Sequence, residues 1–438
     1  MKKILFLVLA LPLLVMGQAF NFTNPFNLNF TEHNNVAEIC IKDSQLPLVL
    51  YYSNYTLSAK RFNGTNFTPE YTITACYYYN IYTSMMNNDN MSSASIGDTI
   101  YISYTNNYNG LSEVFLVSSY NGGVSFNNSI SISGFSNNMH FGIPNIKVNN
   151  GIINISYVGI KDTLPNSNLN TELFTRVFDI NTNQLSPAFN ITSLTNKGNP
   201  YMSCGASILN IGNETFITFR NIYNDTSNIF LAISNDDGHT FNQAFQIDYS
   251  NTTYHYTASH YTPKIFFNND SLYIITNTIH NNQAATEIIA VNTQNYNSSQ
   301  FTRNIFHTDL DTQGDSCIFV GYSFFGNSIA KSKLMFSENG FRGPYTTTYL
   351  TDTTDNLISS YPTIDIKDNV LHITYMGNDS RMYISSNQSA TTVNNIYNKS
   401  KSLIKVIDIL GQETTPKSNT PLFYLYDDGT VEKKIIIE

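Results

Sequence analysis

The sequence contains no tryptophan, only 4 cysteines and 13% charged residues in 438 positions. Basic residues are the scarcer sign, with 23 Lys and Arg against 32 Asp and Glu, so the formal net charge is −9. Nucleic-acid binding by charge needs a basic footprint, and this composition argues against such a partner. Hydrophobic residues still make up 41% of the chain, enough to bury a sizeable core and to argue against disorder.

Long apolar runs are also missing after the first residues. Lys2 and Lys3 precede a short apolar run that ends near Gly17, a pattern typical of a secretory signal peptide over residues 1–17. The run is shorter than the roughly 20 residues that span a bilayer, so a membrane anchor is the weaker reading. We expect an exported protein without a transmembrane segment once the signal is removed.

The few cysteines exclude a disulfide scaffold and show no spacing typical of zinc ligands. An oxidising compartment would permit a bridge between Cys40 and Cys76. Four buried thiols at positions 40, 76, 204 and 317 are an equal alternative.

What the sequence has in abundance is Tyr, Phe, Asn, Ser and Thr, a mixture that favours strands and turns. A hairpin-like pattern of two apolar runs around a polar turn recurs about every 50 residues, most clearly at 144–157, 263–276 and 362–375. Two further strand-like runs follow within a unit. Four short strands per unit predict an all-β fold, a β-propeller of seven four-stranded blades over residues 18–401, with six blades as the alternative. A β-sandwich array and a β-helix explain the restarting hairpin less well.

Ser234, Asp236, Gly238, Thr240 and Phe241 match every specified position of an Asp box, S-x-D-x-G-x-T-[W/F]. Residues 119–126 are a degenerate copy, and 337–340 a weaker trace. The carboxylate would accept turn N–H groups while Gly supplies a permissive backbone. These turns resemble those of the sialidase-like (BNR) propellers, in which the box supports the fold and lies away from the active site.

The last residues form a separate small β domain over 402–438, with strand-like runs at 403–410, 421–426 and 431–437 around the turn 427–429. This tail closely resembles the type A C-terminal sorting domain of the bacterial type IX secretion system. The resemblance implies export across the outer membrane of a Gram-negative bacterium, with the secretion machinery as a partner, and release or attachment at the cell surface. An ordinary closing hairpin is the alternative.

The channel mouth of a propeller is the default ligand site. Loops that enter each innermost strand, and loops between second and third strands, share that face. Imidazole, phenol and amide groups suit a polyhydroxylated ligand because they provide convergent hydrogen bonds and flat apolar surface. The ligand-binding candidates are His33, His140, Tyr201, Arg220, His260 and Tyr361, with Asn107, Asn221, Asp225, His280, Asp311 and Asp379 beside them.

A sialidase would need three convergent arginines, a Tyr–Glu nucleophile pair and an acid/base Asp, as the resemblance implies. The arginines are Arg61, Arg176, Arg220, Arg303, Arg342 and Arg381, and their spacing does not assemble such a triad. We therefore assign no catalytic residue. The favoured function is non-catalytic binding of glycans or another surface partner. A sialidase-type glycoside hydrolase and a structural or adhesive surface protein are the alternatives.

Asp309, Asp311 and Asp315 surround Gly314 and could wrap Ca²⁺, although the distal bidentate Glu of a full calcium loop is missing. A solvated acidic loop is the more economical reading. No other cofactor is expected.

Overall fold

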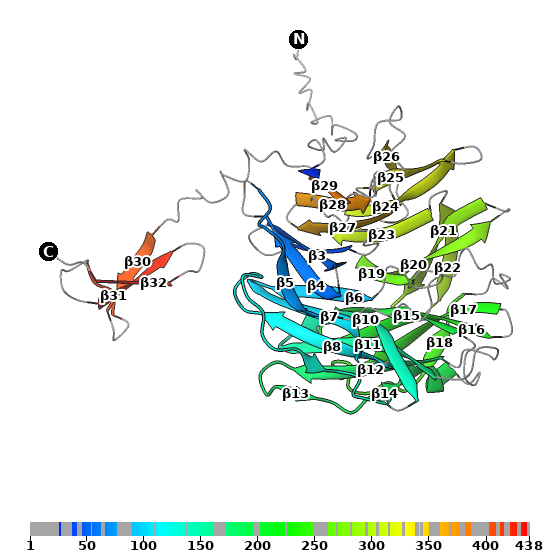
Figure 1. Cartoon of the computed structure of the whole chain (residues 1–438), viewed down its shortest axis with the longest axis horizontal. Coiled ribbons are helices and arrows are strands. Elements are labelled where there is room, and N and C mark those ends of the chain that lie inside the picture. The colour runs from blue at the N-terminus through cyan, green and yellow to red at the C-terminus, as the bar shows by residue number, and fades with distance from the viewer. Residues whose placement is uncertain are drawn as a thin grey trace, which may run out of the picture. The chain divides into compact units, whose positions relative to one another are not determined.

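The structure is a computed structural model that describes residues 26–27 and most of 37–435, with gaps that include 77–89, 162–170, 249–261, 350–359 and 387–402. The chain divides into two compact units, residues 1–388 and 389–438. Within the described residues the first unit is almost entirely β-sheet, and a 3₁₀ helix at Ile191–Thr195 is its one helical turn (Figure 1). None of the described segments forms a helix with the length and apolarity that a membrane crossing requires.

Seven antiparallel sheets make up the first unit: six have four strands and one has five. Each is a blade, and the blades follow one another in chain order. Blades 1 to 4 are β2(Ala37–Ile41), β3(Pro47–Ser53), β4(Thr56–Arg61) and β5(Tyr71–Ala75); β6(Met91–Ile96), β7(Thr99–Tyr108), β8(Leu111–Ser119) and β9(Ile130–Ser131); β10(Met139–Asn149), β11(Ile152–Lys161), β12(Thr171–Asp179), β13(Gln184–Leu185) and β14(Phe189–Asn190); β15(Met202–Ile211), β16(Glu214–Tyr223), β17(Thr226–Ser234) and β18(Ala244–Gln246).

Blades 5 to 7 complete the ring. They are β19(Lys264–Asn268), β20(Ser271–His280), β21(Gln283–Asn292) and β22(Ser298–Arg303); β23(Phe306–Gln313), β24(Ser316–Phe325), β25(Ile329–Ser337) and β26(Thr346–Tyr349); and β27(Ser360–Lys367), β28(Val370–Met376), β29(Met382–Ser386) and β1(Phe26–Asn27). The predicted all-β propeller with seven units is therefore confirmed.

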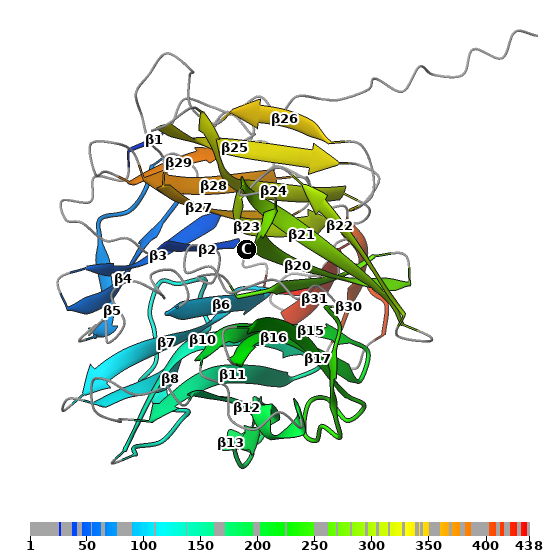
Figure 2. The ribbon, with the colours of Figure 1, turned by 90° about the vertical axis from the view of Figure 1, so that its right-hand side faces the viewer.

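The blades surround a central axis (Figure 2). The first strand of each blade is innermost. Neighbouring first strands contact one another from β23 to β27, from β27 to β2 across the closure, and on through β6, β10 and β15 to β19. The fourth strand of blade 7 comes from the other end of the chain: Phe26 pairs with Ile384 and Asn27 with Tyr383.

An aromatic residue on the second strand of blades 2, 3 and 4 has a packing role. Tyr104, Tyr157 and Phe219 each lie directly opposite an aromatic on the third strand of the same blade. The three pairs, Tyr104–Phe115, Tyr157–Phe174 and Phe219–Phe230, stack with ring centroids 5.8, 5.7 and 5.4 Å apart. Such pairs are worth about 0.5–1.5 kcal/mol beyond area burial. In blades 2 and 4 the residue before this aromatic carries a hydroxyl that donates to a backbone carbonyl of the third strand. Ser103 Oγ donates to the Phe115 oxygen and Thr218 Oγ1 to the Phe230 oxygen, both at 3.1 Å.

The turn over residues 234–241 joins the third and fourth strands of blade 4. Ser234 Oγ accepts the Gly238 N–H at 2.9 Å, and Asp236 accepts from the Thr240 N–H at 2.8 Å and the Thr240 hydroxyl at 2.7 Å. Partial burial alone would raise the pKa of Asp236, but these donors and Ser234 outweigh it and hold the pKa below its usual value. Phe241 is buried against the core between blades 3 and 4.

Three of the cysteines are buried thiols, namely Cys40, Cys76 and Cys317. Cys76 Sγ donates to the Thr105 carbonyl at 3.2 Å, and burial raises the pKa of its thiol. The structure thus has no Cys40–Cys76 bridge, and the buried-thiol alternative holds for these three. The side chain of Cys204 lies outside the described residues.

The second unit contains a three-stranded antiparallel sheet in the order β30–β31–β32, formed by β30(Leu403–Ile407), β31(Pro421–Tyr426) and β32(Val431–Ile435). Val406, Leu422 and Tyr424 form its small core. The three strand-like runs read from the tail sequence are strands here.

Candidate ligand site in the central channel

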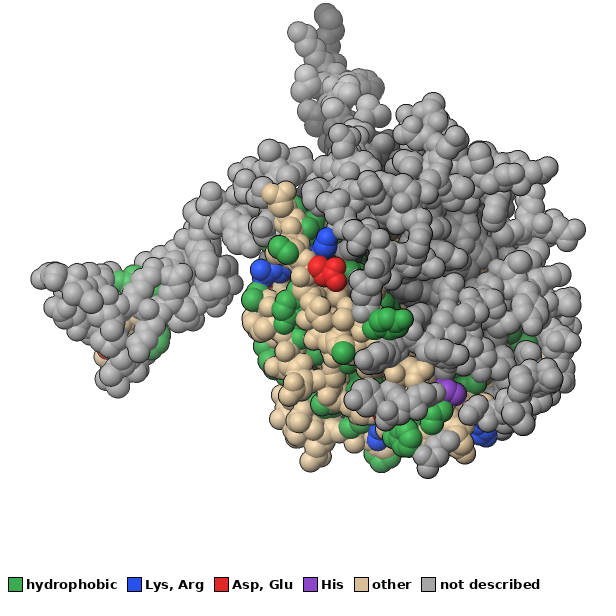
Figure 3. Space-filling model, viewed as in Figure 1, with side chains coloured by type: hydrophobic (Ala, Val, Ile, Leu, Met, Phe, Trp, Pro, Cys, Tyr) green, Lys and Arg blue, Asp and Glu red, His purple; other side chains and the backbone are tan. Residues whose placement is uncertain are grey.

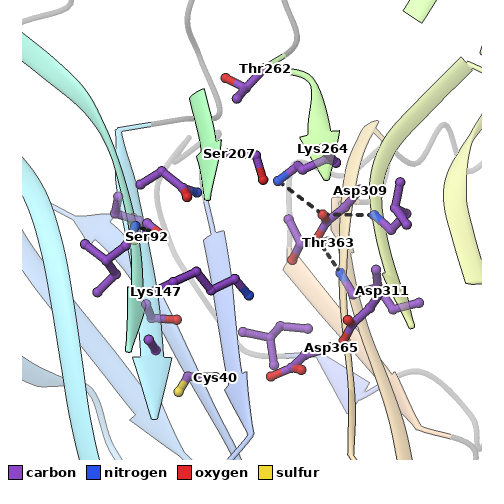
Figure 4. A pocket seen from close by; sticks show the side chains of 18 of the residues that line it. Cys40, Ser92, Lys147, Ser207, Thr262, Lys264, Asp309, Asp311, Thr363 and Asp365 are labelled. Atoms are coloured by element: carbon purple, nitrogen blue, oxygen red, sulfur yellow. Dashed lines mark hydrogen bonds and ion pairs between the residues drawn. The ribbon is translucent and has the colours of Figure 1, made fainter. Parts of the chain in front are cut away.

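The innermost strands enclose a cavity of about 420 Å³ on the propeller axis (Figure 4). Every blade contributes to its wall, with Cys40, Ser92, Lys147, Ser207, Lys264, Asp309 and Thr363 each coming from a different first strand. Ligand pockets in proteins measure roughly 300–1,000 Å³, so this cavity has room for a small ligand or one sugar unit of a chain.

Strand alternation decides which side chains face the cavity. Successive side chains on a strand point to opposite sides, so the residues flanking a buried Ile face the channel. On β10, Ile146 is buried, while Asn145 is half-buried and Lys147 exposed. On β27, Ile364 is buried between the half-buried Thr363 and Asp365. The channel is therefore lined by amide, hydroxyl, ammonium and carboxylate groups.

Several of these polar groups hold neighbouring blades together. Asp309 and Asp311 on β23 accept the N–H groups of Ile364 and Ile366 on β27, at 3.0 and 2.9 Å. Ser92 on β6 likewise accepts the Ile146 N–H of β10 at 3.2 Å, and Asn145 the Ile208 N–H of β15 at 3.1 Å. In each case a side chain of one blade accepts a backbone N–H from the inner strand of the next blade. That N–H lies on the edge of its sheet and has no partner within the sheet.

Lysines and aspartates both line the channel, on strands β10, β19, β23 and β27. Lys264 Nζ lies 3.5 Å from Asp309 Oδ1. Lys147 extends from β10 toward the wall that carries Asp311 and Asp365 (Figure 4). Burial raises the pKa of Asp311, and the Ile366 N–H and the Lys147 ammonium counteract this only in part. Lys147 is thus the exposed cation of the described channel wall, and it faces carboxylates across the cavity.

Arg220 does not line this cavity. It is buried between blades 4 and 5, where its guanidinium donates to Thr276 Oγ1 and to the Asn277 carbonyl, the latter at 2.9 Å. Asp248 and Glu287 are buried beside it. Burial raises the pKa of Asp248 to about 6, although backbone and Gln246 hydrogen bonds and the Arg220 charge oppose the rise. Burial, and then the Asp248 charge, raise the pKa of Glu287 as well.

The other predicted mouth residues are only partly described. His140 lies on β10, where its Nδ1 accepts the Ser112 N–H at 3.3 Å. Asn107 and Asn221 lie on the second strands of blades 2 and 4, and Asn221 is fully buried. Tyr361 on β27 and His280 on β20 have described backbones only, and His33, Tyr201, Asp225, His260 and Asp379 lie outside the described residues.

The acidic residues considered for calcium lie on a strand. Asp309 and Asp311 belong to β23, and Asp315 lies outside the described residues. Within the described part of the chain, no group of three or more His, Cys, Asp or Glu side chains is arranged to hold a metal ion. The calcium site stays a prediction.

Sequence reasoning missed the channel lysines. The repeat itself contains the pattern that identifies them. The hairpins 144–157, 263–276 and 362–375 each begin with Pro. The residues one and three positions after that Pro are Asn145 and Lys147, Lys264 and Phe266, and Thr363 and Asp365. All six residues line the cavity. The motif predicts a hairpin, and alternate residues of its first strand also form the channel wall.

No protein-family profile matches the sequence, and no curated protein matches it. Solved structures do resemble it. The sialidase of Trypanosoma rangeli in complex with sialic acid superposes with a TM-score of 0.50 at 8% identity, over 92% of this chain and 68% of that one. A mutant of this sialidase that displays trans-sialidase activity gives 0.47 at 10% identity, over 80% of this chain, which spans 58% of its length. The endosialidase of phage phi92 gives 0.46 at 11% identity, over 95% and 74% of the two chains. The protein is a β-propeller of sialidase-like architecture.

Proposed function

We propose that this propeller is an exported protein that binds glycans in its central channel without cleaving them. The observation that carries the proposal is the composition of the channel wall, where hydroxyl, amide, ammonium and carboxylate groups converge on about 420 Å³. Sugars are recognised by such convergent donors and acceptors. The sialidase-like architecture is consistent with this ligand class, and it contributes the fold alone.

The described arginines support binding over sialidase chemistry. Arg61, Arg176 and Arg220 belong to blades 1, 3 and 4, and none of the three lines the channel. The Arg176 guanidinium donates hydrogen bonds to the carbonyls of Ser186 and Ile132, which indicates a structural role. A carboxylate ligand in the channel would find lysines among the described wall residues, and not a three-arginine clamp.

Glycoside hydrolysis is the second candidate, because Asp311 and Asp365 bring two carboxyl groups to one cavity. Glycosidases require such a pair. Asp311 already accepts two backbone N–H groups, from Thr312 and Ile366, which favours a structural role for it.

The test is a glycan array with the purified chain from residue 18, beside fluorogenic glycoside assays. We expect binding without turnover, with Lys147→Ala weakening binding by 10-fold or more. Lys161→Ala is the matched control, because Lys161 pairs with Glu172 on the same blade outside the channel. Turnover that disappears in Asp365→Asn would replace the binding proposal with the hydrolase.

We also infer export by the signal peptide at 1–17 and sorting by the tail at 402–438. The support is the sequence pattern together with the three-stranded sheet of the second unit. Deleting residues 402–438 should retain the protein inside a type IX-secreting host. Equal amounts in the medium and on the surface with and without the tail would argue against this route.

A further inference from the structure

Two turns of blade 2 carry large apolar side chains exposed to solvent. Ile96, at the turn between β6 and β7, is 51% exposed, and Tyr120 and Val124, in the turn between β8 and β9, are 63% and 52% exposed. The Gly122 N–H donates to the Asp98 carbonyl at 2.8 Å, so the two turns are joined. We call Ile96, Tyr120 and Val124 the blade-2 patch. The strands are antiparallel, so the β6–β7 and β8–β9 turns lie at one end of the blade and the β7–β8 turn at the other. The blade-2 patch is at the first of these ends.

Blade 4 contains the same pair of turns and serves as an internal reference. The Asp237 N–H donates to the Asn213 carbonyl at 2.8 Å, as Gly122 does to Asp98. The serine that opens each turn accepts the N–H four residues later at 2.9 Å, from Gly123 in one blade and from Gly238 in the other. The two turns therefore share one backbone design.

The exposed positions differ between the two turns. Where blade 2 has Tyr120 and Val124, blade 4 has Asn235 and His239, which are also exposed. The turn folds with polar residues at these places, so its fold does not require the apolar side chains of blade 2. Apolar side chains that are exposed together and that the fold does not use are typical of an interaction site.

The surroundings of the patch indicate its ligand. Asn121, Ser125 and Asn127 are exposed in the same turn as Tyr120 and offer amide and hydroxyl groups. Neither 96–99 nor 119–128 contains Lys or Arg, and Asp98 is their single charge. The described surface visible in Figure 3 likewise carries few charged side chains. An anionic polymer or lipid surface would find no cation in these turns, and a cationic partner would find a single carboxylate, that of Asp98, so the two turns favour an uncharged partner.

The size of the patch argues against a stable protein interface. Three partly exposed side chains supply roughly 300 Å², since a whole aromatic side chain buries about 150–250 Å². A stable protein–protein interface needs about 800 Å² on each side. An aromatic ring bordered by amides and hydroxyls suits a flat sugar ring, which has an apolar face and a polar rim.

From this we propose that the blade-2 patch is a second binding site, for a neutral polysaccharide, with Tyr120 as the stacking platform. The site is separate from the channel, because none of its three residues lines that cavity. Two sites on one rigid propeller would raise the affinity for a polysaccharide surface beyond that of either alone.

The test is native affinity electrophoresis of the full chain in gels that contain laminarin, hydroxyethyl cellulose or xyloglucan, with carboxymethyl cellulose as the anionic comparison. The double variant Tyr120→Asn/Val124→His carries the residues of the blade-4 turn and should keep the melting temperature. We expect a neutral polysaccharide to retard the native chain, and the double variant to bind it at least 10-fold more weakly. Tyr120→Phe keeps the ring and should bind as the native chain does.

The same comparison in a Lys147→Ala background separates this site from the channel, since the patch should still retard the chain when channel binding is lost. The proposal is wrong if none of the three neutral polymers retards the chain, or if the double variant binds them unchanged. It is also wrong if the double variant instead abolishes a concentration-dependent dimer in sedimentation velocity, because a second copy would then occupy the patch.

Discussion

Asp311 on β23 accepts the backbone N–H of Ile366 on β27, with 2.9 Å between Oδ2 and nitrogen, and so joins blade 6 to blade 7 inside the channel. Asp309 does the same for Ile364 two residues earlier. The acidic pair that the sequence suggested for calcium thus forms a connection between two sheets, and it supports the channel wall from which a ligand would be bound.

Removing the Asp311 carboxylate should destabilise the propeller. Asp311→Ala leaves the partly buried Ile366 N–H without its acceptor, at a cost of about 1–3 kcal/mol in the free energy of unfolding. Asp311→Asn keeps one acceptor oxygen and should cost less. Urea denaturation followed by circular dichroism measures both, and equal stability of Asp311→Ala and the native chain would contradict the structural role.

The buried carboxyl of Asp248 should make stability depend on pH. Its pKa is raised to about 6 in the folded chain, against an ordinary value of 3.8. The folded state therefore binds the proton more tightly, and stability is fully present below about pH 4 and is lost as pH rises through about 6. The loss from this group is on the order of 3 kcal/mol.

Asp248→Asn should remove most of that slope, because the amide stays neutral. Unfolding free energies of native and variant chains between pH 4 and pH 8 measure the difference. Arg220, Gln246 and Glu287 act on the same carboxyl, and the raised pKa of Glu287 adds a slope of the same sign. If the unfolding free energy of Asp248→Asn depends on pH as strongly as that of the native chain, a group other than Asp248 takes up the proton.

The turn at 234–241 should depend on its carboxylate. Asp236→Ala removes the acceptor for the N–H and hydroxyl of Thr240 and should cost about 1–3 kcal/mol. Asp236→Asn should cost less, because Asn121 occupies the corresponding place in blade 2 and accepts the Ser125 N–H at 2.9 Å. Thermal unfolding of the two variants gives the comparison, and an equally large loss for both would show that the charge itself is needed.

The stacked pair in blade 4 should show a measurable coupling. Phe219 and Phe230 lie opposite each other on neighbouring strands with ring centroids 5.4 Å apart. A double-mutant cycle with Leu at each position should give a coupling of about 0.5–1.5 kcal/mol. A coupling near zero would mean that the two rings contribute through burial alone.

The propeller could be predicted because its information is local and repeated. In a hairpin such as 144–157, the two strands, the turn and the terminal aromatic can all be predicted from a few neighbouring residues. The repetition of this pattern along the chain predicts the ring of blades. Where a given side chain lies relative to the channel mouth could not be predicted in the same way. Its position at the end of a strand-like run predicts that Arg220 faces the mouth, whereas the structure buries it against Thr276 and Asn277 of the next blade. That contact depends on the angle between blades, which no single repeat encodes.

The pairing of Phe26 with Ile384 has a consequence for how the molecule is made. The strand that completes the last sheet is synthesised first, and its partners are synthesised hundreds of residues later. Non-local pairing of this kind slows folding. The circle therefore stays open until almost the whole polypeptide is present, and losing only a few residues near its beginning would leave the final sheet one strand short.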